Sequence, residues 1–568
     1  MIISTSSAFL VQTTRDIQSP TERPPHSMNQ RALPPCRLLA YLLAAVAIGN
    51  LQIVHAAQTC ALKISLLDES GAPVPGLIRV SVDNDKAVPL PNLINRGAML
   101  RRGSPAKEWH CLVEPAVISL PQARVTVNAI SGIETRLTSK TIDLAGKQQA
   151  NLTLKLKRFS NLREDGWRAG NTHVHTRNMT RAESNRYLQA VGLSDDLELI
   201  FVSHLRRAQA EKTYISNEYT KRDLRALSLP GLTFENGEEH RHNFGGGGEG
   251  FGHVMLLDLN ELVRPVSVGP GIMKTGTDAP PLARGIVTAR KDGATVVWCH
   301  NNFGYEDIPN WLSGRVDAQN IFDGGNRGGY EDTFYRYLNL GIRVPFSTGT
   351  DWFIYDFSRV YAHIGDKKLT AHNWLTSLNQ GRTFISNGPL LDLRIGGAKI
   401  GAVINLRTQD ELPIHAQAKG RINFGHIELI RNGEVIGSAD SMKDDGFFTA
   451  SIEINSKADR TSWFALRVAN PIQQTGANAP ARGTGAGKNE LGEPLFAHTS
   501  PIYVRVDDEP QFDLETARQL VKDMEAGLLA IQMRAVFADD RERAAVEGVY
   551  KDAISELNRN IAADTGSR

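Results

Sequence analysis

The chain has little net charge, few cysteines and no apolar run long enough to cross a membrane. The chain has 568 residues, of which 41% are hydrophobic, and it carries 64 basic and 62 acidic side chains. Because the two charge signs nearly cancel, the composition indicates neither a nucleic-acid partner nor an anionic membrane surface. It is the composition of an ordinary globular protein, and at roughly 150 residues per domain the length allows about three or four domains.

An apolar run at 38–48 follows two basic residues, Arg31 and Arg37. The run is about 11 residues long, whereas a transmembrane helix needs about 20, so we expect no stable membrane anchor. A basic stretch followed by a short apolar run is typical of a secretory signal peptide.

A small-residue site near Ala56 follows this run and is typical of a signal-peptide cleavage site. The polar stretch 1–27 would be unusual before a signal peptide, which favours Met28 as the natural start. We therefore interpret residues 1–57 as a signal peptide with an upstream extension. We expect an exported protein, periplasmic or extracellular, whose mature chain begins near Ala57.

The sequence has four cysteines, and cleavage near Ala57 would remove Cys36. Cys60 and Cys111 flank one candidate β domain and can pair in an oxidising compartment, although two unpaired thiols fit the sequence equally well. Cys299 ends an apolar run, and we expect it to be a buried thiol.

Two regions follow the N-terminal segment and differ in pattern. Short alternating runs such as 62–66 and 152–156, separated by turn signals, predict a β-sandwich over 60–158. Strand-like runs that alternate with helical stretches such as 283–291 then predict an α/β barrel over 166–388.

Strand patterns return at 427–430 and 502–506 and predict a second β-sandwich over 389–508. A loop at 470–493, rich in glycine, alanine, asparagine and proline, interrupts this sandwich without a metal or phosphate signature. Apolar residues at helical spacing predict a helical tail over 511–568.

The residues that can carry chemistry concentrate in the middle region. His173 and His175 lie two residues apart, so on an extended segment both imidazoles share a face and can bind one cation. Two further strand-like runs end at His204 and His300, and a third leads into Asp351. Because α/β barrels assemble their sites where parallel strands end, the repetition predicts a metal site.

Between these motifs, the segment 234–242 offers the adjacent carboxylates Glu238 and Glu239, and His253 follows on the next apolar run. One carboxylate can bridge two metals while His253 completes the second site, but spacing alone does not choose between the glutamates. The glycine-rich loop 245–250 lacks a following Gly-Lys-Ser/Thr, so we interpret it as flexible access to the site and not as a P-loop.

From Gly166 to about Leu393, the order of these motifs resembles the PHP-type metallohydrolases, specifically the CehA/McbA group related to carbaryl hydrolase. The region from Cys60 to Leu156 is similar, less specifically, to a transthyretin-like or carboxypeptidase-regulatory module. The motifs that carry the main resemblance are, in chain order, His173-x-His175, the strand ending in His204, Gly237-Glu238-Glu239, Gly252-His253, the strand ending in His300, Gly349-Thr350-Asp351 and the segment 380–389.

The resemblance implies a distorted (β/α)7 barrel flanked by the two β-sandwiches, with two divalent ions. The family pattern Gly-x-Glu favours Glu239 over Glu238 as the bridging ligand. His204 matches a histidine that would be a third-site ligand or a residue behind the ligands. The implied ligand sets are His173, His175, Glu239 and Asp351 for one metal, and Glu239, His253 and His300 for the other.

This chain departs from the family pattern at two places. Asp351 is followed by Trp352 and Phe353, where many PHP proteins have Asp-x-His, so we expect the third metal site to be incomplete. Asn171 replaces an acidic residue that often precedes the first histidine, which changes the support behind the ligands.

Nitrogen and oxygen ligands without thiolate suit zinc, manganese or iron. Such metals lower the pKa of bound water from about 16 to about 7, so no serine or cysteine nucleophile is needed. Arg206 and Arg359 are the candidate catalytic cations that stabilise the developing anion.

We therefore expect an exported metal-dependent hydrolase that acts on a small-molecule ester-like bond, either a phosphoester or a carboxylate or carbamate ester. The alternative is an exported binding protein, with an inactive barrel and β-sandwiches that hold glycan or protein partners. Retention of nearly all the ligands of two sites argues against the alternative, because unused buried polar groups are costly.

Overall fold

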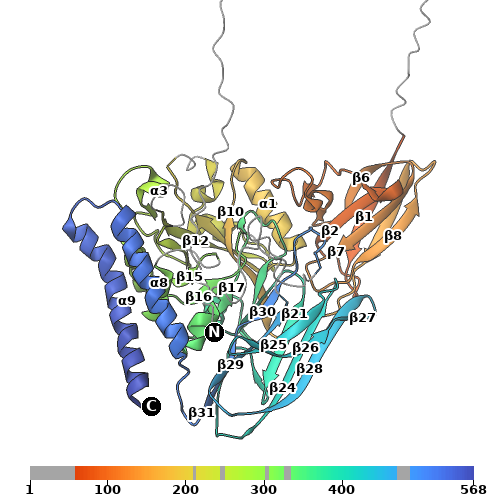
Figure 1. The fold of residues 1–568 in the computed structure, drawn as a ribbon. Coiled ribbons are helices and arrows are strands. Elements are labelled where there is room, and N and C mark those ends of the chain that lie inside the picture. Colours follow the sequence, from red (N-terminus) through yellow and green to blue (C-terminus); the bar gives the residue numbers. More distant parts are fainter. Residues whose placement is uncertain are drawn as a thin grey trace, which may run out of the picture. The chain divides into compact units, whose positions relative to one another are not determined.

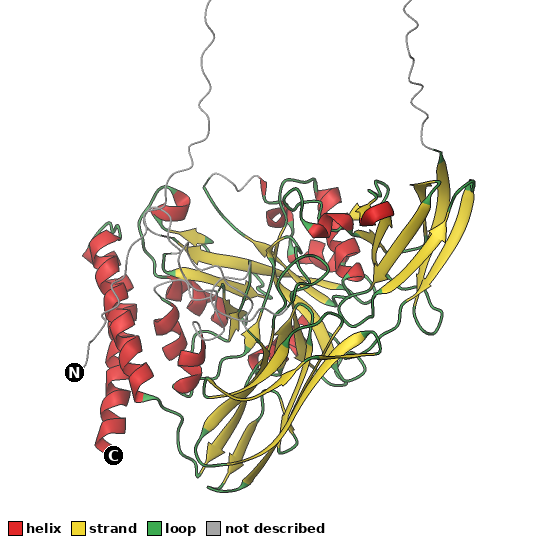
Figure 2. Cartoon of the chain, turned by 45° about the vertical axis from the view of Figure 1, so that its right-hand side comes forward, coloured by secondary structure: helices red, strands yellow, loops and turns green. Residues whose placement is uncertain are grey.

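Strands and helices alternate through the middle of the chain, whereas strands dominate the regions on either side (Figures 1 and 2). The computed structural model describes residues 58–208, 213–243, 250–300, 306–324, 334–469 and 487–567. The expected signal peptide at 1–57 lies outside these residues, as does most of the glycine-rich loop 245–250. The fold class is mixed α/β, as the sequence predicts.

The N-terminal β region contains two sheets. Apolar side chains that alternate along β1 point inward, and Leu62 and Ile64 are fully buried, so the sheets enclose one core. This arrangement is compatible with a β-sandwich. One sheet has the order β6 (Ala116–Pro121), β1 (Thr59–Leu67), β9 (Gln149–Lys155), and the other has β4 (Ile94–Asn95), β5 (His110–Leu112), β2 (Gly76–Val82), β7 (Arg124–Ile130), β8 (Thr138–Asp143), with β3 (Lys86–Ala87) beside β2.

The two cysteines of this region do not form a disulfide. Cys60 lies in β1 and Cys111 in β5, and both are buried free thiols. They belong to different hydrophobic clusters, with Cys60 inside the sandwich and Cys111 among residues that face the middle region. Of the two possibilities that the sequence left open, the structure therefore has unpaired thiols.

The central strands belong to one large sheet that mixes parallel and antiparallel pairs. Strands β10, β11 and β12 are parallel to one another, while β13 runs antiparallel to both β12 and β15. The bounds are β10 (Trp167–His175), β11 (Leu199–His204), β12 (Thr233–His242), β13 (Gly252–Leu257), β14 (Ser267–Val268), β15 (Thr295–Trp298), β16 (Ala318–Asn320), β17 (Phe346–Ser347), β18 (Asp351–Trp352), β19 (Arg359–His363) and β20 (Thr383–Ser386).

Helices connect and cover these strands. Helix α1 begins with a capping box in which Thr180 and Glu183 satisfy each other's backbone N–H groups. The bounds are α1 (Arg181–Ser194), α2 (Lys221–Leu227), α3 (Pro270–Met273), α4 (Leu282–Lys291), α5 (Asp307–Leu312), α6 (Arg336–Asn339) and α7 (Ala371–Asn379), with 3-10 turns at Asp83–Asp85, Pro105–Glu108 and Ile215–Glu218.

The α/β barrel expected over 166–388 is not seen as a closed structure. Within the described residues, the strand pairings do not close into a barrel, and the sheet instead continues from β20 into the C-terminal region through β30. Antiparallel neighbours such as β13 and β19 also break the regular parallel order that a barrel of repeated βα units requires.

The C-terminal β region again packs two sheets face to face around buried residues such as Ile414 and Leu429, which is compatible with a sandwich. One sheet has the order β22 (Ala398–Lys399), β21 (Leu390–Ile395), β24 (Glu411–Gly420), β28 (Phe447–Lys457), β27 (Met442–Asp444). The other strands join the large sheet and are β23 (Val403–Leu406), β25 (His426–Arg431), β26 (Glu434–Asp440), β29 (Ser462–Val468), β30 (Ala497–Thr499) and β31 (Ile502–Val506).

The chain ends in two helices, α8 (Leu514–Arg534) and α9 (Asp540–Ser567), which lie side by side (Figure 1). Leu520, Met524 and Ile531 are spaced along one face of α8 and are buried. These three residues are therefore core residues, whereas Leu529 and Met533 of the same helix are exposed. None of the described helices is both long and apolar enough to cross a membrane.

Residues 57–568 form one compact unit, so the expected boundaries at 158, 388 and 508 stay predictions.

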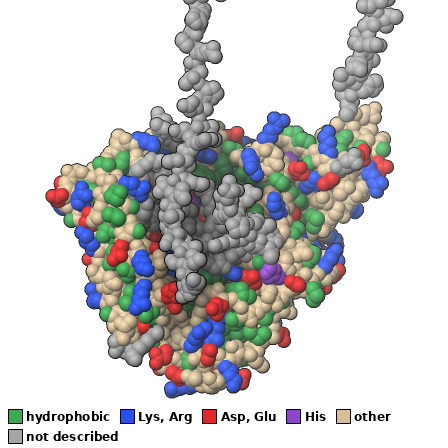
Figure 3. All heavy atoms as spheres, in the orientation of Figure 1, with side chains coloured by type: hydrophobic (Ala, Val, Ile, Leu, Met, Phe, Trp, Pro, Cys, Tyr) green, Lys and Arg blue, Asp and Glu red, His purple; other side chains and the backbone are tan. Residues whose placement is uncertain are grey.

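Charged side chains of both signs are dispersed over the face shown in Figure 3. This dispersal agrees with the balanced charge of the sequence.

Candidate metal centre

His173 and His175 come together because β10 is extended, so alternate side chains share one face. The segment with Gly349 and Asp351 lies directly against them, and the Thr350 N–H donates to the His173 carbonyl at 3.0 Å. A Cβ at Gly349 would overlap the Cβ of His173, so only glycine allows this close approach. Asp351 has a φ of 55°, a strained conformation of the kind that clusters at functional sites.

The first cluster consists of His173, His175, Glu239 and Asp351, all buried. The two Nε2 atoms of the histidines lie 2.9 Å apart. Glu239 Oε2 is 3.0 Å from His175 Nε2 and 3.8 Å from His173 Nε2. Asp351 Oδ1 lies 3.5 Å from His173 Nε2 and 3.7 Å from His175 Nε2. Four potential ligand atoms thus surround one point and could hold a metal ion.

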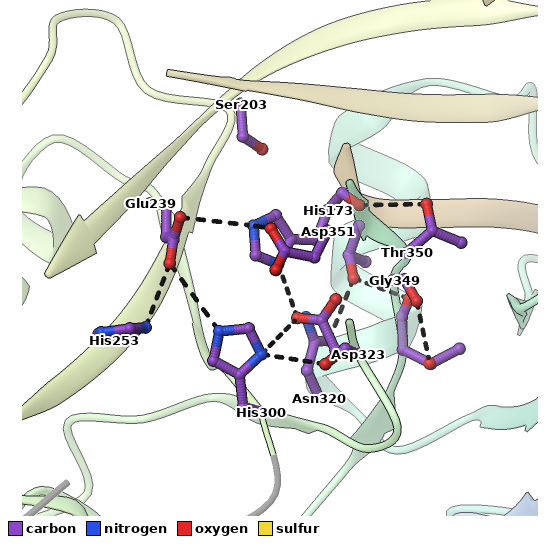
Figure 4. Close-up of polar contacts among 12 residues, drawn as sticks. His173, Ser203, Glu239, His253, His300, Asn320, Asp323, Gly349, Thr350 and Asp351 are labelled. Atoms are coloured by element: carbon purple, nitrogen blue, oxygen red, sulfur yellow. Dashed lines mark hydrogen bonds and ion pairs between the residues drawn. The ribbon is translucent and has the colours of Figure 1, made fainter. Parts of the chain in front are cut away.

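The second cluster shares Glu239 with the first and adds His253 and His300 (Figure 4). Glu239 Oε1 is 3.2 Å from His253 Nδ1 and 3.9 Å from His300 Nε2. The two carboxylate oxygens of Glu239 therefore face different clusters. This is the arrangement that a carboxylate adopts when it bridges two cations.

Glu238 points away from both clusters. Its Oε1 lies 3.0 Å from His240 Nδ1, and its Oε2 accepts the Val263 N–H at 2.7 Å. Adjacent residues of a strand face opposite sides of a sheet, so only one member of the neighbouring pair Glu238 and Glu239 can reach the histidines of the two clusters. The structure brings Glu239 into the clusters, as the family pattern favours.

Each imidazole of the two clusters is anchored through the ring nitrogen that points away from them. An oxygen of a carboxylate, a backbone carbonyl or a side-chain amide accepts that hydrogen bond, so the anchored nitrogen carries the proton. The other nitrogen then directs its lone pair into the cluster. The pairs are His173 Nδ1 with Asp323 Oδ2 at 2.6 Å, His175 Nδ1 with the Ser203 carbonyl at 2.8 Å, His300 Nδ1 with the Asp323 carbonyl at 3.0 Å, and His253 Nε2 with Asn243 Oδ1 at 3.1 Å.

The negative charges of the buried carboxylates favour the presence of a positive charge within the clusters. Burial opposes protonation of His173, but Asp323 and Asp351 outweigh it and raise the pKa of His173 well above its usual value. Burial likewise opposes protonation of His300, whereas hydrogen bonding to Glu239 and the charge of Asp323 raise its pKa to about 9. This positive charge can be supplied either by a proton on an imidazole or by a metal ion.

Asp323 is a site residue that the sequence patterns do not reveal. It is buried, it orients His173, and it accepts a hydrogen bond from Asn320 Nδ2 at 2.9 Å. It follows β16, which has only three residues, so the strand-end pattern that marks His300 is too short here to be recognised. Such an acceptor fixes the tautomer and the orientation of a ligand histidine.

Cys299 is a buried thiol, as expected, and lies close to His173 and Asp323. Burial raises the pKa of the Cys299 thiol, which keeps it protonated and makes it a poor ligand. Because His173 Nδ1 and Asp323 Oδ2 are bonded to each other, we interpret this group as support behind the first cluster.

His204 and Arg206 lie near the clusters but outside them. His204 ends β11 and belongs to none of the metal-binding groups found among the described residues. Burial and the neighbouring Arg264 lower the pKa of His204 to about 4, so this imidazole is neutral near pH 7. Arg206 is close enough to contribute to the same shift.

Arg359 has the contacts of a structural arginine. It lies buried in β19, where its Nε donates to the Phe357 carbonyl at 2.9 Å and its Nη1 to the Asp195 carbonyl at 2.8 Å. The structure does not bring Arg359 into either cluster. Among the described residues, Arg241 contacts a cluster, with its Nη1 3.4 Å from Glu239 Oε1. Arg241 lies on the same strand as Glu239, so its position in the sequence could have suggested it.

The two departures from the family pattern, Asn171 and the pair Trp352 and Phe353 after Asp351, have defined places in the structure. Asn171 Oδ1 accepts the His173 N–H at 3.0 Å, and Asn171 Nδ2 donates to Thr350 Oγ1 at 2.9 Å. Asn171 thus ties the two ligand-bearing segments together. The Trp352 ring packs against His175 with a centroid distance of 5.3 Å, which leaves no ligand at this position.

The two clusters contain six of the seven metal ligands expected from the sequence, and His204 is the one left out. Searches with this chain against protein-family models, curated proteins and solved structures found no match.

Proposed function

We propose that the protein is an exported, metal-dependent hydrolase that cleaves an ester-like bond of a small molecule, either a phosphoester or a carboxylate or carbamate ester. One observation carries the proposal: four anchored imidazoles direct their other ring nitrogens into two clusters that share the carboxylate of Glu239. Without positive charge in the clusters, supplied by protons on His173 and His300 or by a metal ion, the buried carboxylates would be unpaired, which is costly.

The proposal includes membership of the PHP-type metallohydrolases, in the CehA/McbA group, whose (β/α)7 barrel would here be distorted over 166–388, with strands of mixed direction and no closure among the described residues. Its support is the placement of ligands at strand ends. His175 ends β10, His300 follows β15, and Asp351, which begins the short strand β18, lies shortly after the end of β17. Ligands at the carboxyl ends of strands are typical of α/β barrel enzymes.

Each of the site residues can be given a role in hydrolysis. In this reaction the hydroxyl of water adds to the acyl or phosphoryl group, and the proton of the water is transferred to the alcohol that leaves. Divalent ions such as zinc, manganese or iron, when bound, supply activated water at neutral pH and polarise the carbonyl or phosphoryl oxygen. Glu239 would hold both ions, and Asp323 would keep His173 oriented toward one of them. Arg241, next to Glu239, would supply a positive charge that stabilises the negative charge developing on the carbonyl or phosphoryl oxygen of the substrate.

The experiment that tests this proposal begins with purified protein and elemental analysis. Removal of metal with a chelator should abolish hydrolysis, and addition of zinc, manganese or iron should restore it. Full turnover by metal-free protein would overturn the proposal.

The substrate class needs a matched panel. An aryl phosphate, an aryl carboxylate ester and an aryl carbamate that release the same phenol should be compared at equal metal content. We expect turnover of at least one of them. No turnover on any ester, together with partner binding that survives the Asp351→Ala change, would favour a binding protein.

Export has its own test, because residues 1–57 lie outside the described structure. N-terminal sequencing of the protein from its native compartment should find a mature chain that begins near Ala57. Intact protein that begins at Met1 in the cytosol would contradict export.

A further inference from the structure

A cationic and aromatic wall lies beside His175. The Trp352 ring packs against His175 and stacks on Tyr214, with ring centroids 5.6 Å apart and planes inclined by 28°. The guanidinium carbon of Arg177 lies 4.5 Å from the centroid of the Trp352 ring. We call Arg177, Trp352 and Tyr214 the Trp352 wall.

Arg177 is held in this position but makes no ion pair. Its backbone bridges that of Tyr214, two residues beyond the end of β10, and its side chain stacks on Trp352. Within the described part of the chain, no acceptor is found for its guanidinium N–H groups. Arg181 offers a contrast, because it also stacks on a ring, that of Tyr219, but donates to the Glu218 carbonyl at 2.7 Å and pairs with Asp223.

Tyr214 also has an unused polar group. Its side chain is 1% exposed, and its hydroxyl has no hydrogen-bond partner in the described residues. Buried hydroxyl groups are rarely left unpaired, because the loss of hydration is not offset. Arg177 is half-buried, so water can reach its guanidinium, and the buried Tyr214 hydroxyl is the group that indicates a ligand with an acceptor oxygen. Arg177, stacked on the same Trp352 ring, adds a positive charge to this wall.

We propose that the Trp352 wall binds an oxyanion carried by the substrate, a carboxylate or a phosphate, and that Arg177 determines specificity for anionic esters. The inference rests on the proposed hydrolase function. An arginine fork matches the two oxygens of such a group, and stacking on Trp352 orients the fork before the substrate arrives. The Tyr214 hydroxyl can donate a further hydrogen bond to the same group.

The first test compares hydrolysis by the metal-loaded wild type and Arg177→Gln. The substrates are 4-nitrophenyl acetate, which is neutral, 4-nitrophenyl hemisuccinate, 4-carboxyphenyl acetate and acetyl phosphate. For at least one anionic substrate we expect kcat/KM to fall about tenfold or more, because a charge-assisted hydrogen bond contributes that much. For 4-nitrophenyl acetate we expect a change below about twofold. The substrate that is affected shows whether the oxyanion is a carboxylate or a phosphate.

Arg181→Gln is the matched control, since it removes an arginine that stacks on a ring but has partners of its own. It should leave all four values of kcat/KM unchanged. Tyr214→Phe keeps the ring and removes only the hydroxyl, so it should weaken the same anionic substrate selectively. Melting temperatures show whether each variant remains folded.

The second test does not depend on turnover. Calorimetry should measure the binding of succinate, inorganic phosphate and acetate to the wild type and Arg177→Gln. We expect the Kd of succinate or phosphate to rise about tenfold or more in the variant and the Kd of acetate to stay the same.

The outcomes separate the two proposals. If no ester is hydrolysed but the variant loses succinate or phosphate binding, the hydrolase proposal fails and the Trp352 wall stands. If esters are hydrolysed and Arg177→Gln affects neutral and anionic compounds equally, the hydrolase stands and the anion-binding wall is overturned.

Discussion

At the scale of single residues, the two neighbouring glutamates of β12 have different surroundings. Glu239 faces four histidines, whereas Glu238 accepts a backbone N–H from Val263 and contacts His240. The difference follows from the alternation of side chains along a strand, which gives adjacent and chemically identical residues separate roles.

The pair supplies a matched experiment. Glu239→Gln removes the carboxylate that both clusters share, so we expect bound metal to fall from two ions toward none and hydrolysis to collapse. Glu238→Gln leaves both clusters intact and should keep its metal. Elemental analysis after dialysis measures the difference. Equal metal content in the two variants would contradict a bridging role for Glu239.

His300 belongs to the second cluster only, so its loss should be partial. We expect native protein to bind at most two metals tightly, and His300→Ala to bind about one, because the four residues of the first cluster remain. Trp352 and Phe353 provide no ligand for a third ion. Three metals in the native protein would show that ligands outside the described clusters take part.

At the scale of secondary-structure elements, β30 joins the central sheet to the C-terminal strands through β20 and β29. His498 lies in this strand, fully buried. Its Nδ1 donates to the Thr499 carbonyl at 2.8 Å, and the Tyr335 hydroxyl donates to its Nε2 at 2.6 Å. Burial lowers the pKa of His498 to about 3, so the imidazole stays neutral in the folded protein.

This lowered pKa predicts a loss of stability in acid. Unfolded histidine takes up a proton below about pH 6.5 while folded His498 does not, so its stabilising contribution is present above pH 6.5 and is lost toward pH 3. The loss by pH 5 is about 2 kcal/mol.

Urea unfolding at pH 7 and pH 5 measures this loss. His498→Gln cannot be charged and should lose less stability between the two pH values than the wild type. His415→Gln, at a half-exposed position of β24, is the control and should behave like the wild type. If the His498→Gln and wild-type losses are equal, acid sensitivity arises from other groups.

At the scale of the whole molecule, the metal centre joins segments from distant parts of the chain. The ligands of the two clusters come from β10, β12, β13 and β18 and from the segment that follows β15. A cation that binds there stabilises the folded state, because the unfolded chain does not hold these ligands together.

Chelation should therefore lower the melting temperature as well as activity. At a free metal concentration of about 100 times Kd, bound metal contributes about 2.7 kcal/mol, which chelation removes. Addition of metal should restore the melting temperature of the wild type but have a smaller effect on Asp351→Ala, which lacks one ligand. Scanning calorimetry with and without chelator measures both. A wild type whose melting temperature does not respond to metal would contradict a metal centre in the fold.

The sequence by itself determined the type of most elements and the residues that could hold a metal ion. Apolar periodicity is local, so it predicts strands, the amphipathic tail helices and the mixed α/β class without knowledge of contacts. Strand-end histidines and Asp351 indicated a metal site for the same reason, since a strand end can be recognised from a few neighbouring residues.

Only the tertiary structure decided which side chains meet. The orientation of Glu238 and Glu239 depends on which face of β12 meets the histidines, and Asp323 reaches His173 across 150 positions of the chain. Burial of Arg359 against Asp195 is likewise a long-range contact. Such contacts depend on strand pairing and packing between distant segments, which no local pattern of residues specifies, and the same packing leaves the central strands without the closed barrel that their alternation with helices predicts.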